Sequence, residues 1–573
     1  MQRLRTTLIG GLLAGAAAMA SSPYREPVPF SHTWDVGYGY ALFVTGNHAD
    51  LGNWSPESAV KLFWTAGNTW TGSVAIQAGH ALEYKFIRRS MASCDYCNGA
   101  NVEWMPGANL TRSIPAQPPA PYAGKTVYYY SGWTNASLVY RVGTNWFGKD
   151  LERAGPGRSS GEYLYRADGV GEAGEGIEFV PNGWLDGAQN WDHAPYGGYG
   201  NSNYYTTLDV FLLQDGQIYN YWPAAQVAAP RVVTNYVDSS FAGISGRLAR
   251  IYLPRGYDDH AWKRYPVLYL HDGQNVFSPG GPNGSWDADL TATREVSQGR
   301  MRECILVGLD HTTLRQSEYE PPGDTYYTGY PPGRGDAYVN FIVHNVRPAL
   351  DFNFRTLNDF RNTLIGGSSM GGLISIYAGF ETNVFGGVLA LSPSITRAPN
   401  YEAALAARPK RPLRIYEDTG TDEGSVGPGG GNYWEKPWEA YDLFLAKGYA
   451  PNADLLMRIG CGHVHNESAW AARLPAAFQY LLDVRNEANR LAHHRFPPVL
   501  GVLTNPPAVT LRSDTLDHFR YQLEQSTNLL SGRWTRAGAA WTNPLPWGPR
   551  NWPDPSPPAP PLWYYRLTAE PVP

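Results

Sequence analysis

The chain has 573 residues, which is too long for one hydrophobic core and predicts roughly three to five domains. Aromatic residues make up 13% and charged residues only 17%, a composition typical of proteins that stack on sugars and also of β-rich exported proteins. The net charge of −5 and an isoelectric point near 6.2 give no reason to expect nucleic acid or an anionic membrane surface as a partner.

The N-terminus predicts export. Arg3 and Arg5 precede an apolar run, and Ala18-Met19-Ala20 supplies a small-residue cleavage pattern, so residues 1–20 are expected to be a signal peptide. The apolar run is too short and too rich in Ala and Gly for a membrane span, and no other stretch is long enough to cross a bilayer. We therefore expect a secreted or periplasmic protein, with attachment to the cell surface as an alternative.

The four cysteines are Cys94, Cys97, Cys304 and Cys461. Cys94 and Cys97 have the spacing of redox and zinc motifs, but no second cysteine pair or histidine pair follows to complete a metal site. In an oxidising compartment this spacing favours a local Cys94–Cys97 disulfide that braces a loop. Cys304 opens an apolar run and is expected to be buried, and whether Cys304 pairs with Cys461 stays open.

Residues 31–115 alternate short strands with turn residues, as in a small β-sandwich. They contain "GNHADLGNW", "EYKFI" and "VEWMPGAN", and over this length they resemble the starch-binding modules of carbohydrate-binding family 20. An indole face matches the apolar face of a pyranose ring, and ammonium or amide groups bind its hydroxyls. The alternative is that the tryptophans are core residues. The resemblance implies one glucan site made of Trp54, Lys85, Trp104 and Asn109, and a second site that includes Tyr38.

Residues 121–226 open on the strand "KTVYYYSGW" and later carry "NWD" before a stretch rich in Asn, Gly and Tyr. They resemble the starch-binding modules of carbohydrate-binding family 25, which implies a second β-sandwich with Trp146 and Trp191 stacking on sugar. Val139 stands where that family has a histidine, and the insert "GWLDGAQ" departs from its pattern. Burial of the two tryptophans is again the alternative.

A joint rich in Pro and Ala leads into residues 232–486, where apolar strands such as "YPVLYLHD" and "VFGGVLALSP" alternate with helical stretches. This rhythm predicts a doubly wound α/β sheet. Residues 497–573 are rich in Pro, Trp and Thr and resemble the small β domains that end many secreted bacterial proteins, so we expect a C-terminal accessory β domain.

The stretch "LIGGSSMGGLISIY" (364–377) places a serine between glycines at the junction of a predicted strand and helix. Gly367-Ser368-Ser369-Met370-Gly371 fits the pattern G-x-S-x-G, in which side chains at the flanking positions would clash in the tight turn. The turn lifts the serine hydroxyl to the carboxyl edge of the sheet. The sequence therefore predicts Ser369 as a nucleophile.

A serine hydroxyl needs a base and an orienting acid. The strand "LRIYEDTG" is followed by Asp422 and Glu423, and the strand "LLMRIG" by "CGHVHNESAW", so acid and histidine arrive at the same sheet edge in the order required. With "LHDGQNVF" and "RQSEYEP", these residues resemble the esterase D / enterochelin-esterase branch of the α/β-hydrolases, which also holds the carbohydrate esterase family 1 enzymes and the mycolyltransferases. The resemblance implies His465 as general base, with His463 spare, and Glu423 as the acid, with Asp422 as runner-up.

The oxyanion hole is expected from the backbone N–H of Met370 and from the turn near Gly273. His271 is expected to brace that turn, while His311 and His344 are interpreted as ordinary residues. No cofactor and no metal is expected.

These parts together predict an exported serine carboxylic-ester hydrolase that binds starch-like or glycogen-like α-glucan and cleaves acyl esters on or near it, with no nucleic acid and no membrane span. Three alternatives stay open: acyl transfer to sugar hydroxyls, a siderophore or polyester esterase, and a non-catalytic glucan-binding adhesion protein. The sequence does not identify the acyl group, because the cleft is expected to be walled by the loops 317–336 and 424–438, whose shapes do not follow from composition.

Overall fold

The computed structural model describes residues 25–114 and 124–486, apart from short stretches at 78, 80, 98–100, 186–187, 196–202, 225, 262, 326–328 and 425–432. It also describes the backbone of the strands between 501 and 571. The expected signal peptide, residues 1–20, lies outside the described residues.

Residues 25–114, here called the first β domain, form two sheets of antiparallel strands. Phe30 and Val74 from one sheet meet Leu42 and Phe86 from the other in a shared core, since alternate side chains of each strand point inward. One sheet has the order β1 (Arg25–Thr33), β5 (Thr69–Gln77), β4 (Phe63–Thr65). The other has the order β3 (Val60–Lys61), β2 (Tyr40–Gly46), β6 (Ala81–Ser90), β7 (Val102–Trp104), with β8 (Leu110–Ser113) also pairing with β6.

Residues 124–222, the second β domain, form a largely antiparallel sheet around the buried side chains of Val127, Leu138, Phe179 and Phe211. Its strands run in the order β14 (Ala188–Trp191), β13 (Ile177–Leu185), β10 (Ala136–Val142), β11 (Asn145–Pro156), β12 (Tyr163–Val170), β9 (Lys125–Ser131), β16 (Val210–Gln214), β17 (Gln217–Tyr219), and β15 (Tyr204–Thr206) pairs with β13.

Residues 231–486, the α/β domain, contain an eight-stranded sheet. In the order of the sheet, the first two strands pair antiparallel, and the other six run parallel to one another. Four of these strands are buried at every position, as expected for a sheet covered on both faces. The order is β18 (Arg231–Val237), β19 (Arg247–Leu253), β21 (Ile305–Leu309), β20 (Val267–His271), β22 (Thr363–Ser368), β23 (Gly387–Leu391), β24 (Arg414–Gly420), β25 (Leu455–Gly460). This is the doubly wound α/β sheet predicted from the sequence.

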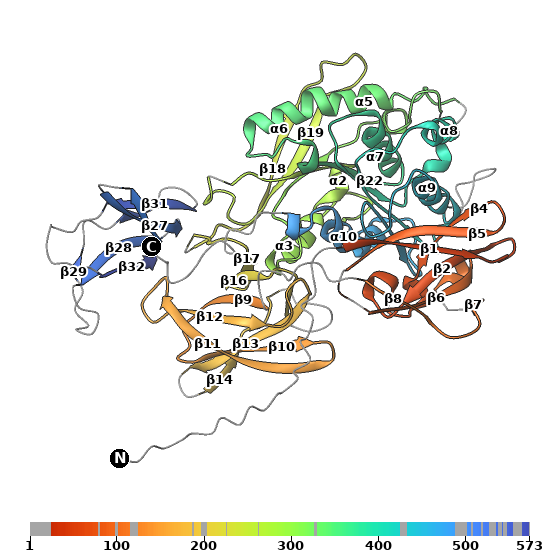
Figure 1. Ribbon diagram of the computed structural model, residues 1–573. Coiled ribbons are helices and arrows are strands. Elements are labelled where there is room, and N and C mark those ends of the chain that lie inside the picture. Colours follow the sequence, from red (N-terminus) through yellow and green to blue (C-terminus); the bar gives the residue numbers. More distant parts are fainter. Residues whose placement is uncertain are drawn as a thin grey trace.

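Helices cover both faces of this sheet (Figure 1). On one face lie α5 (Gly335–Phe341), α6 (Arg347–Asn353), α7 (Met370–Glu381), α8 (Pro399–Ala407) and α9 (Glu435–Ala446), with a π-helical turn, Ile342–Val346, joining α5 to α6. On the other face lie α3 (Ala288–Ser297) and α10 (Glu467–Leu481). The short helices α2 (Gly273–Val276) and α4 (Arg315–Glu318) follow β20 and β21, at the edge where the catalytic loops are expected.

The first β domain packs directly on the α/β domain beside α9 (Figure 1). The Nδ2 of Asn452 donates to the carbonyl of Asp50 at 2.9 Å, and Lys61 pairs with Asp442. The buried apolar residues of the two domains form one continuous cluster, which includes a contact between the rings of Phe43 and Trp438. The two domains therefore share a core.

A disulfide joins Cys97 of the first β domain to Cys461 of the α/β domain, 364 residues apart in sequence. The predicted local bridge between Cys94 and Cys97 is therefore wrong. Cys97 ends the one-turn helix α1 (Ser93–Tyr96), which places its side chain toward the α/β domain. Cys304 is free and buried, so it does not pair with Cys461.

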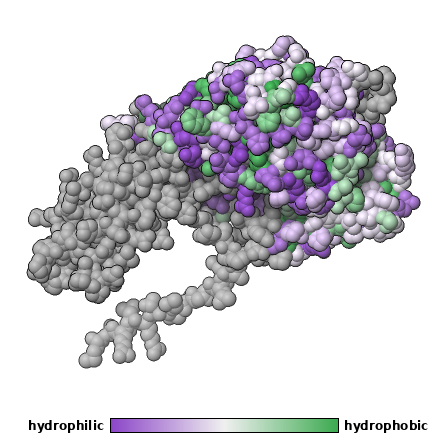
Figure 2. All heavy atoms as spheres, turned by 90° about the horizontal axis from the view of Figure 1, so that it is seen from above, coloured by the Kyte–Doolittle hydropathy of each residue, from purple (hydrophilic) through white to green (hydrophobic). Residues whose placement is uncertain are grey.

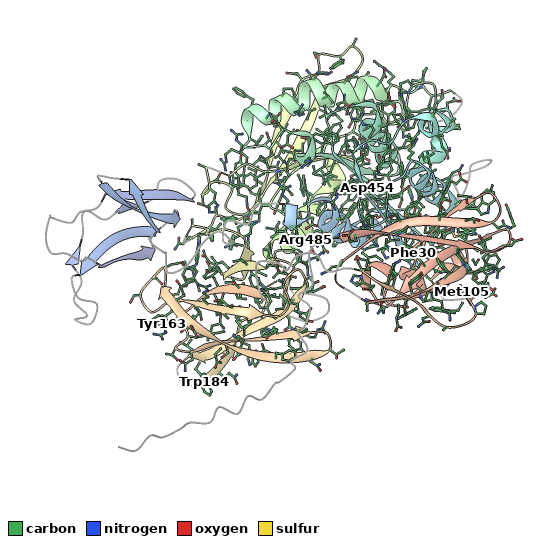
Figure 3. The ribbon with its side chains drawn as sticks, in the orientation of Figure 1. Phe30, Met105, Tyr163, Trp184, Asp454 and Arg485 are labelled. Atoms are coloured by element: carbon green, nitrogen blue, oxygen red, sulfur yellow. A yellow bond between two sulfur atoms is a disulfide. The ribbon has the colours of Figure 1, made fainter. Side chains whose placement is uncertain are left out.

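The second β domain also packs on the α/β domain. The hydroxyl of Thr206 donates to the carbonyl of Gly299 at 3.1 Å, and the hydroxyl of Tyr221 donates to Glu303 at 2.8 Å. Arg485, after the last helix of the α/β domain, lies at this junction (Figure 3).

The strands beyond residue 500 form two small antiparallel sheets. They are β26 (Gly501–Asn505), β27 (Ala508–Leu516) and β31 (Trp547–Pro553), and then β29 (Thr535–Arg536), β28 (Phe519–Ser526), β30 (Trp541–Thr542) and β32 (Tyr564–Pro571). No helix among the described residues has the length and apolar character needed to span a bilayer. Figure 2 shows hydrophilic residues mixed with small, scattered hydrophobic groups on the face of the α/β domain seen from above, as on an ordinary wetted surface.

Glu320, in the loop after α4, is a fully buried carboxyl group. Neither of its oxygens has a hydrogen-bond partner among the described residues. Burial, together with nearby Asp324, raises the pKa of Glu320 to about 8, although Arg397 acts in the opposite direction. The folded chain thus keeps this carboxyl protonated at neutral pH. Because the carboxyl group holds its proton more tightly in the folded chain than in the unfolded chain, protonation adds to the free energy of unfolding. This contribution is fully present below about pH 4.5 and is lost as the pH rises through about 8.

We therefore expect the difference in Tm between the Glu320→Gln variant and the wild type to increase by a few degrees, in favour of the variant, from about pH 5 to about pH 8. Differential scanning calorimetry across this range measures it, with Glu435→Gln, at an exposed position, as the matched control. Parallel curves for Glu320→Gln and the wild type would contradict the raised pKa.

Candidate active site

Ser369 lies between the end of β22 and the start of α7, with φ 57° and ψ −122°. A non-glycine residue adopts these angles only at a cost, which surrounding contacts must offset. The glycines of the motif are needed for space. A Cβ on Gly367 would lie 2.7 Å from the backbone of Gly371, and one on Gly371 would lie 3.2 Å from the Cβ of His271. The turn leaves Ser369 half-buried and open to a cavity.

His465 follows β25 and Glu423 follows β24, so both stand at the same sheet edge as Ser369. The Nδ1 of His465 lies 3.0 Å from Oε2 of Glu423. A carboxylate can only accept, so Nδ1 carries the proton and Nε2 is left as a base. Nε2 is buried and has no hydrogen-bond partner among the described residues.

The carboxylate of Glu423 is buried and held by three donors. Its Oε1 accepts from the hydroxyl of Ser392 at 2.5 Å, from the N–H of Gly420 at 2.6 Å and from Nη2 of Arg473 at 3.3 Å. Arg473 is buried too and also pairs with Asp418 at 3.0 Å. A buried charge is tolerated only when it is paired and hydrogen-bonded in this way.

The hydroxyl of Ser369 lies 3.0 Å from that of Ser394, in the loop after β23, and the N–H of Ser394 donates to the carbonyl of Ser369. No hydrogen bond joins Ser369 to His465 in this structure, since Nε2 of His465 is without a partner. Catalytic hydrogen bonds often form only when substrate is bound. Ser394 therefore holds the hydroxyl of Ser369 in this structure.

Ser369 and His465 line one cavity of about 300 Å³. Its wall combines Trp286 and Trp470 with mostly polar residues, which are Asp272, Asn275, Asn283, His311, Arg315, Gln316, Ser368 and Glu467. Such a lining offers many donors and acceptors close to the nucleophile, which suits a substrate that carries hydroxyl groups.

Asp272, His311 and Arg315 form a cluster in the wall of this cavity. Oδ1 of Asp272 accepts from Nε of Arg315 at 2.6 Å and from Nδ1 of His311 at 2.9 Å. Burial would raise the pKa of Asp272, but Arg315 and His311 lower it well below its usual range. Interpreting His311 as an ordinary residue missed this cluster. The available signal was its place just after the apolar strand β21, at the carboxyl edge of the sheet.

The other expected site residues lie as follows. Met370 and Gly273 begin α7 and α2, so their N–H groups are among the first-turn donors that a helix leaves unpaired. His271 is fully buried, with Nδ1 at 2.9 Å from the hydroxyl of Tyr338, and burial lowers its pKa to about 3. Nδ1 of His463 lies 3.1 Å from Nη1 of Arg473, and Asp422 is exposed. Neither residue is among those that line the cavity.

In the first β domain, the structure brings together two of the four residues expected to bind glucan, Trp54 and Trp104. The rings of Trp54 and Trp104 lie 6.4 Å apart at 39°, and Trp104 is 40% exposed. Lys85 donates to the carbonyl of Gly107 at 2.6 Å, and Asn109 lies 3.5 Å from Glu83. Tyr38 is fully exposed in the turn before β2.

In the second β domain, Trp146 and Trp191 are about half exposed, at 46% and 45%. Strand register places both tryptophans on one face of the sheet. Trp146 lies opposite Arg141, which in turn lies opposite Glu178 on β13. Trp191 lies opposite Asn182, four residues after Glu178 on the same strand and therefore on the same face. Trp184 shares this face, is 50% exposed and stands at the outer end of the domain (Figure 3). Sequence reasoning missed Trp184, since it falls in the insert that departs from the family pattern.

Comparison with known proteins separates the two parts of the chain. Residues 246–500 match the family model described as "Putative esterase", and residues 26–121 match that of the starch binding domain. An alpha-amylase from Streptomyces violaceus is 41% identical over 87 residues, which are 15% of this chain and 14% of that amylase. The uncharacterized protein YjcH from Bacillus subtilis is 27% identical over 186 residues, 32% of this chain and 70% of that protein.

Among solved structures, the chain is similar to the CE1 ferulic acid esterase from the anaerobic fungus Anaeromyces mucronatus, with 22% identity, a TM-score of 0.34 and coverage of 47% of this chain and 99% of that enzyme. The chain spans only a small part of the length of the amylase that it matches. The starch binding domain to which that similarity belongs occupies residues 26–121. Residues 246–500 of the chain therefore match a putative esterase family, and a match to the starch binding domain stands ahead of them.

Proposed function

We propose that this chain is an exported serine carboxylic-ester hydrolase that binds starch-like α-glucan and cleaves acyl esters on or near that polysaccharide. The observation that carries the proposal is that the unpaired Nε2 of His465 and the hydroxyl of Ser369 line one cavity, while Glu423 holds the other nitrogen of the same ring. This is the relation that a nucleophile, a base and an orienting acid require.

In the proposed reaction, Ser369 attacks the acyl carbonyl while Nε2 of His465 takes its proton. The N–H groups of Met370 and Gly273 stabilise the oxyanion of the tetrahedral intermediate. His465 then returns the proton to the leaving alcohol, which departs and leaves Ser369 acylated. Water enters and attacks the acyl carbonyl while giving a proton to His465, and His465 returns this proton to the oxygen of Ser369 as the carboxylic acid leaves. Glu423 keeps His465 in the productive tautomer throughout.

The starch-binding domain supports a glucan as the surface on which this chemistry takes place. Trp54 and Trp104 supply ring faces for stacking, while Lys85 and Asn109 supply an ammonium and an amide group for hydrogen bonds to the sugar hydroxyls. We extend the proposal to the second β domain, whose Trp146, Trp184 and Trp191 share one exposed sheet face, in keeping with its resemblance to family 25 modules. Docking on an insoluble polymer raises the effective concentration of nearby esters at Ser369.

The first test is the Ser369→Ala variant on a panel of soluble acetyl, butyryl and feruloyl esters and on acetylated starch. We expect kcat to fall at least about 10³-fold on every ester that the wild type cleaves, because the acyl-enzyme cannot form. The relative rates of the wild type identify the preferred acyl group. Equal rates for the two proteins would remove the esterase mechanism proposed here.

The second test separates the two candidate acids. Glu423→Gln should lower kcat by about 10³- to 10⁴-fold on a soluble ester, since a neutral amide no longer fixes the tautomer of His465. Asp422→Asn is the matched control, one residue away on the exposed side of the same loop, and should keep the wild-type kcat. The reverse result would make Asp422 the acid.

The third test separates binding from chemistry. Trp54→Ala combined with Trp104→Ala should abolish adsorption to granular starch and slow the hydrolysis of acetylated starch by about 10²-fold or more. Hydrolysis of a soluble acetyl ester should be unchanged, because these rings do not line the catalytic cavity. Trp146→Ala with Trp191→Ala measures the share of the second β domain in adsorption. Retained adsorption in the first variant would show that Trp54 and Trp104 are not the glucan site.

A further inference from the structure

We infer that the starch-binding first β domain supplies positioning residues for the histidine of the esterase site: Cys97 holds the loop that carries His465, and Tyr96 holds the segment whose Tyr433 ring stacks on it. The inference rests on the proposed role of His465 as general base. It concerns catalysis on any ester, soluble or polymeric, and is thus separate from glucan binding.

The first segment is the loop after β25. Cys461 is its first residue, only four positions before His465, and it is bonded to Cys97 with a Cα–Cα distance of 5.6 Å. The loop is also tied to the loop that carries Glu423, since the N–H of Gly462 donates to the hydroxyl of Thr421 at 2.8 Å. The covalent bond therefore fixes the base of the loop that presents the imidazole.

The second segment precedes α9. The ring of Tyr433 stacks on the imidazole of His465 with centroids 4.1 Å apart at 28°. The next residue, Trp434, is buried, and its indole Nε1 donates to the carbonyl of Met91 in the first β domain at 2.6 Å. A shift of Trp434 would therefore move the ring that covers His465.

Tyr96 is the residue of the first β domain that packs on this segment. Its ring lies 5.1 Å from that of Trp434 and 5.6 Å from that of Trp438, measured between centroids. Tyr96 is itself fixed, because the buried Arg89 donates to its carbonyl at 2.6 Å and places its guanidinium 3.9 Å from the ring. Adjacent residues Tyr96 and Cys97 thus restrain the segment that covers His465 and the loop that carries it.

These contacts restrict the imidazole in a way that its bond to Glu423 cannot. The hydrogen bond at Nδ1 and the edge contact with Trp470, at 5.1 Å between centroids, fix two aspects of the ring's position. The stacked Tyr433 and the anchored Cys461 further limit where Nε2 can point. A misplacement of about 1 Å at a catalytic group can lower the rate about 10²-fold. Losing the restraint should therefore lower kcat, while substrate contacts, and with them KM, should stay the same.

The experiment compares the full-length wild type with the Cys97→Ser/Cys461→Ser double variant on a soluble acetyl ester. We expect kcat to fall about 10- to 100-fold with KM within about twofold, and labelling of Ser369 by a fluorophosphonate to slow in parallel. Adsorption to starch should be unchanged, because the variant keeps both tryptophan rings, Trp54 and Trp104. Cys94→Ser is the matched control and should behave like the wild type.

A second pair of variants keeps the disulfide. Tyr96→Leu removes the ring that packs on Trp434 and Trp438 and should lower kcat with unchanged KM, whereas Tyr96→Phe keeps a ring there and should restore it. Wild-type kcat in both the double-cysteine variant and Tyr96→Leu would overturn the inference, as would equal losses in Tyr96→Leu and Tyr96→Phe. Failure of the proposed function is distinguishable, because it would appear as equal rates for the wild type and Ser369→Ala.

Discussion

The arrangement at the sheet edge depends on one buried electrostatic interaction, the pairing of Arg473 with Glu423 and Asp418. Three buried carboxyl groups, those of Glu417, Asp418 and Glu423, stand in the second half of β24 and the loop after it. Burial raises the pKa of Asp418, and the charge of Arg473 acts in the opposite direction. Arg473 projects from α10 and pairs with Asp418 and Glu423, so it binds α10 to the strand that the helix covers. The same guanidinium thus stabilises the fold and holds the carboxyl group that contacts His465.

Much of this could be predicted from the sequence, because the signals are local. The glycines around Ser369 reflect a tight turn, and the order of strand, acid, strand and histidine follows from parallel topology. The doubly wound sheet is confirmed, and the matches to a putative esterase family and to the starch binding domain agree with the resemblances stated for those residues, whereas the family 25 resemblance stays a prediction. The catalytic roles of Ser369, Glu423 and His465 stay predictions, although the structure brings their loops to one edge.

The errors of sequence reasoning concern contacts between distant parts of the chain. The spacing of Cys94 and Cys97 suggested a local bridge, but a disulfide partner depends on which surfaces meet, and Cys461 is brought to Cys97 only when the first β domain packs on the α/β domain. His311 was missed for a related reason. Its importance comes from Asp272, which the fold supplies from the turn that follows the neighbouring strand β20.

The shared core between the first β domain and the α/β domain has a consequence for how such proteins change over evolutionary time. Carbohydrate-binding modules are often pictured as cassettes that recombination can add, drop or exchange. Here Phe43 and Tyr96 bury the rings of Trp434 and Trp438, so removing the module would leave that aromatic surface uncovered on the hydrolase. Loss of the module alone would therefore destabilise the other domain unless substitutions at Trp434 and Trp438 made that surface polar.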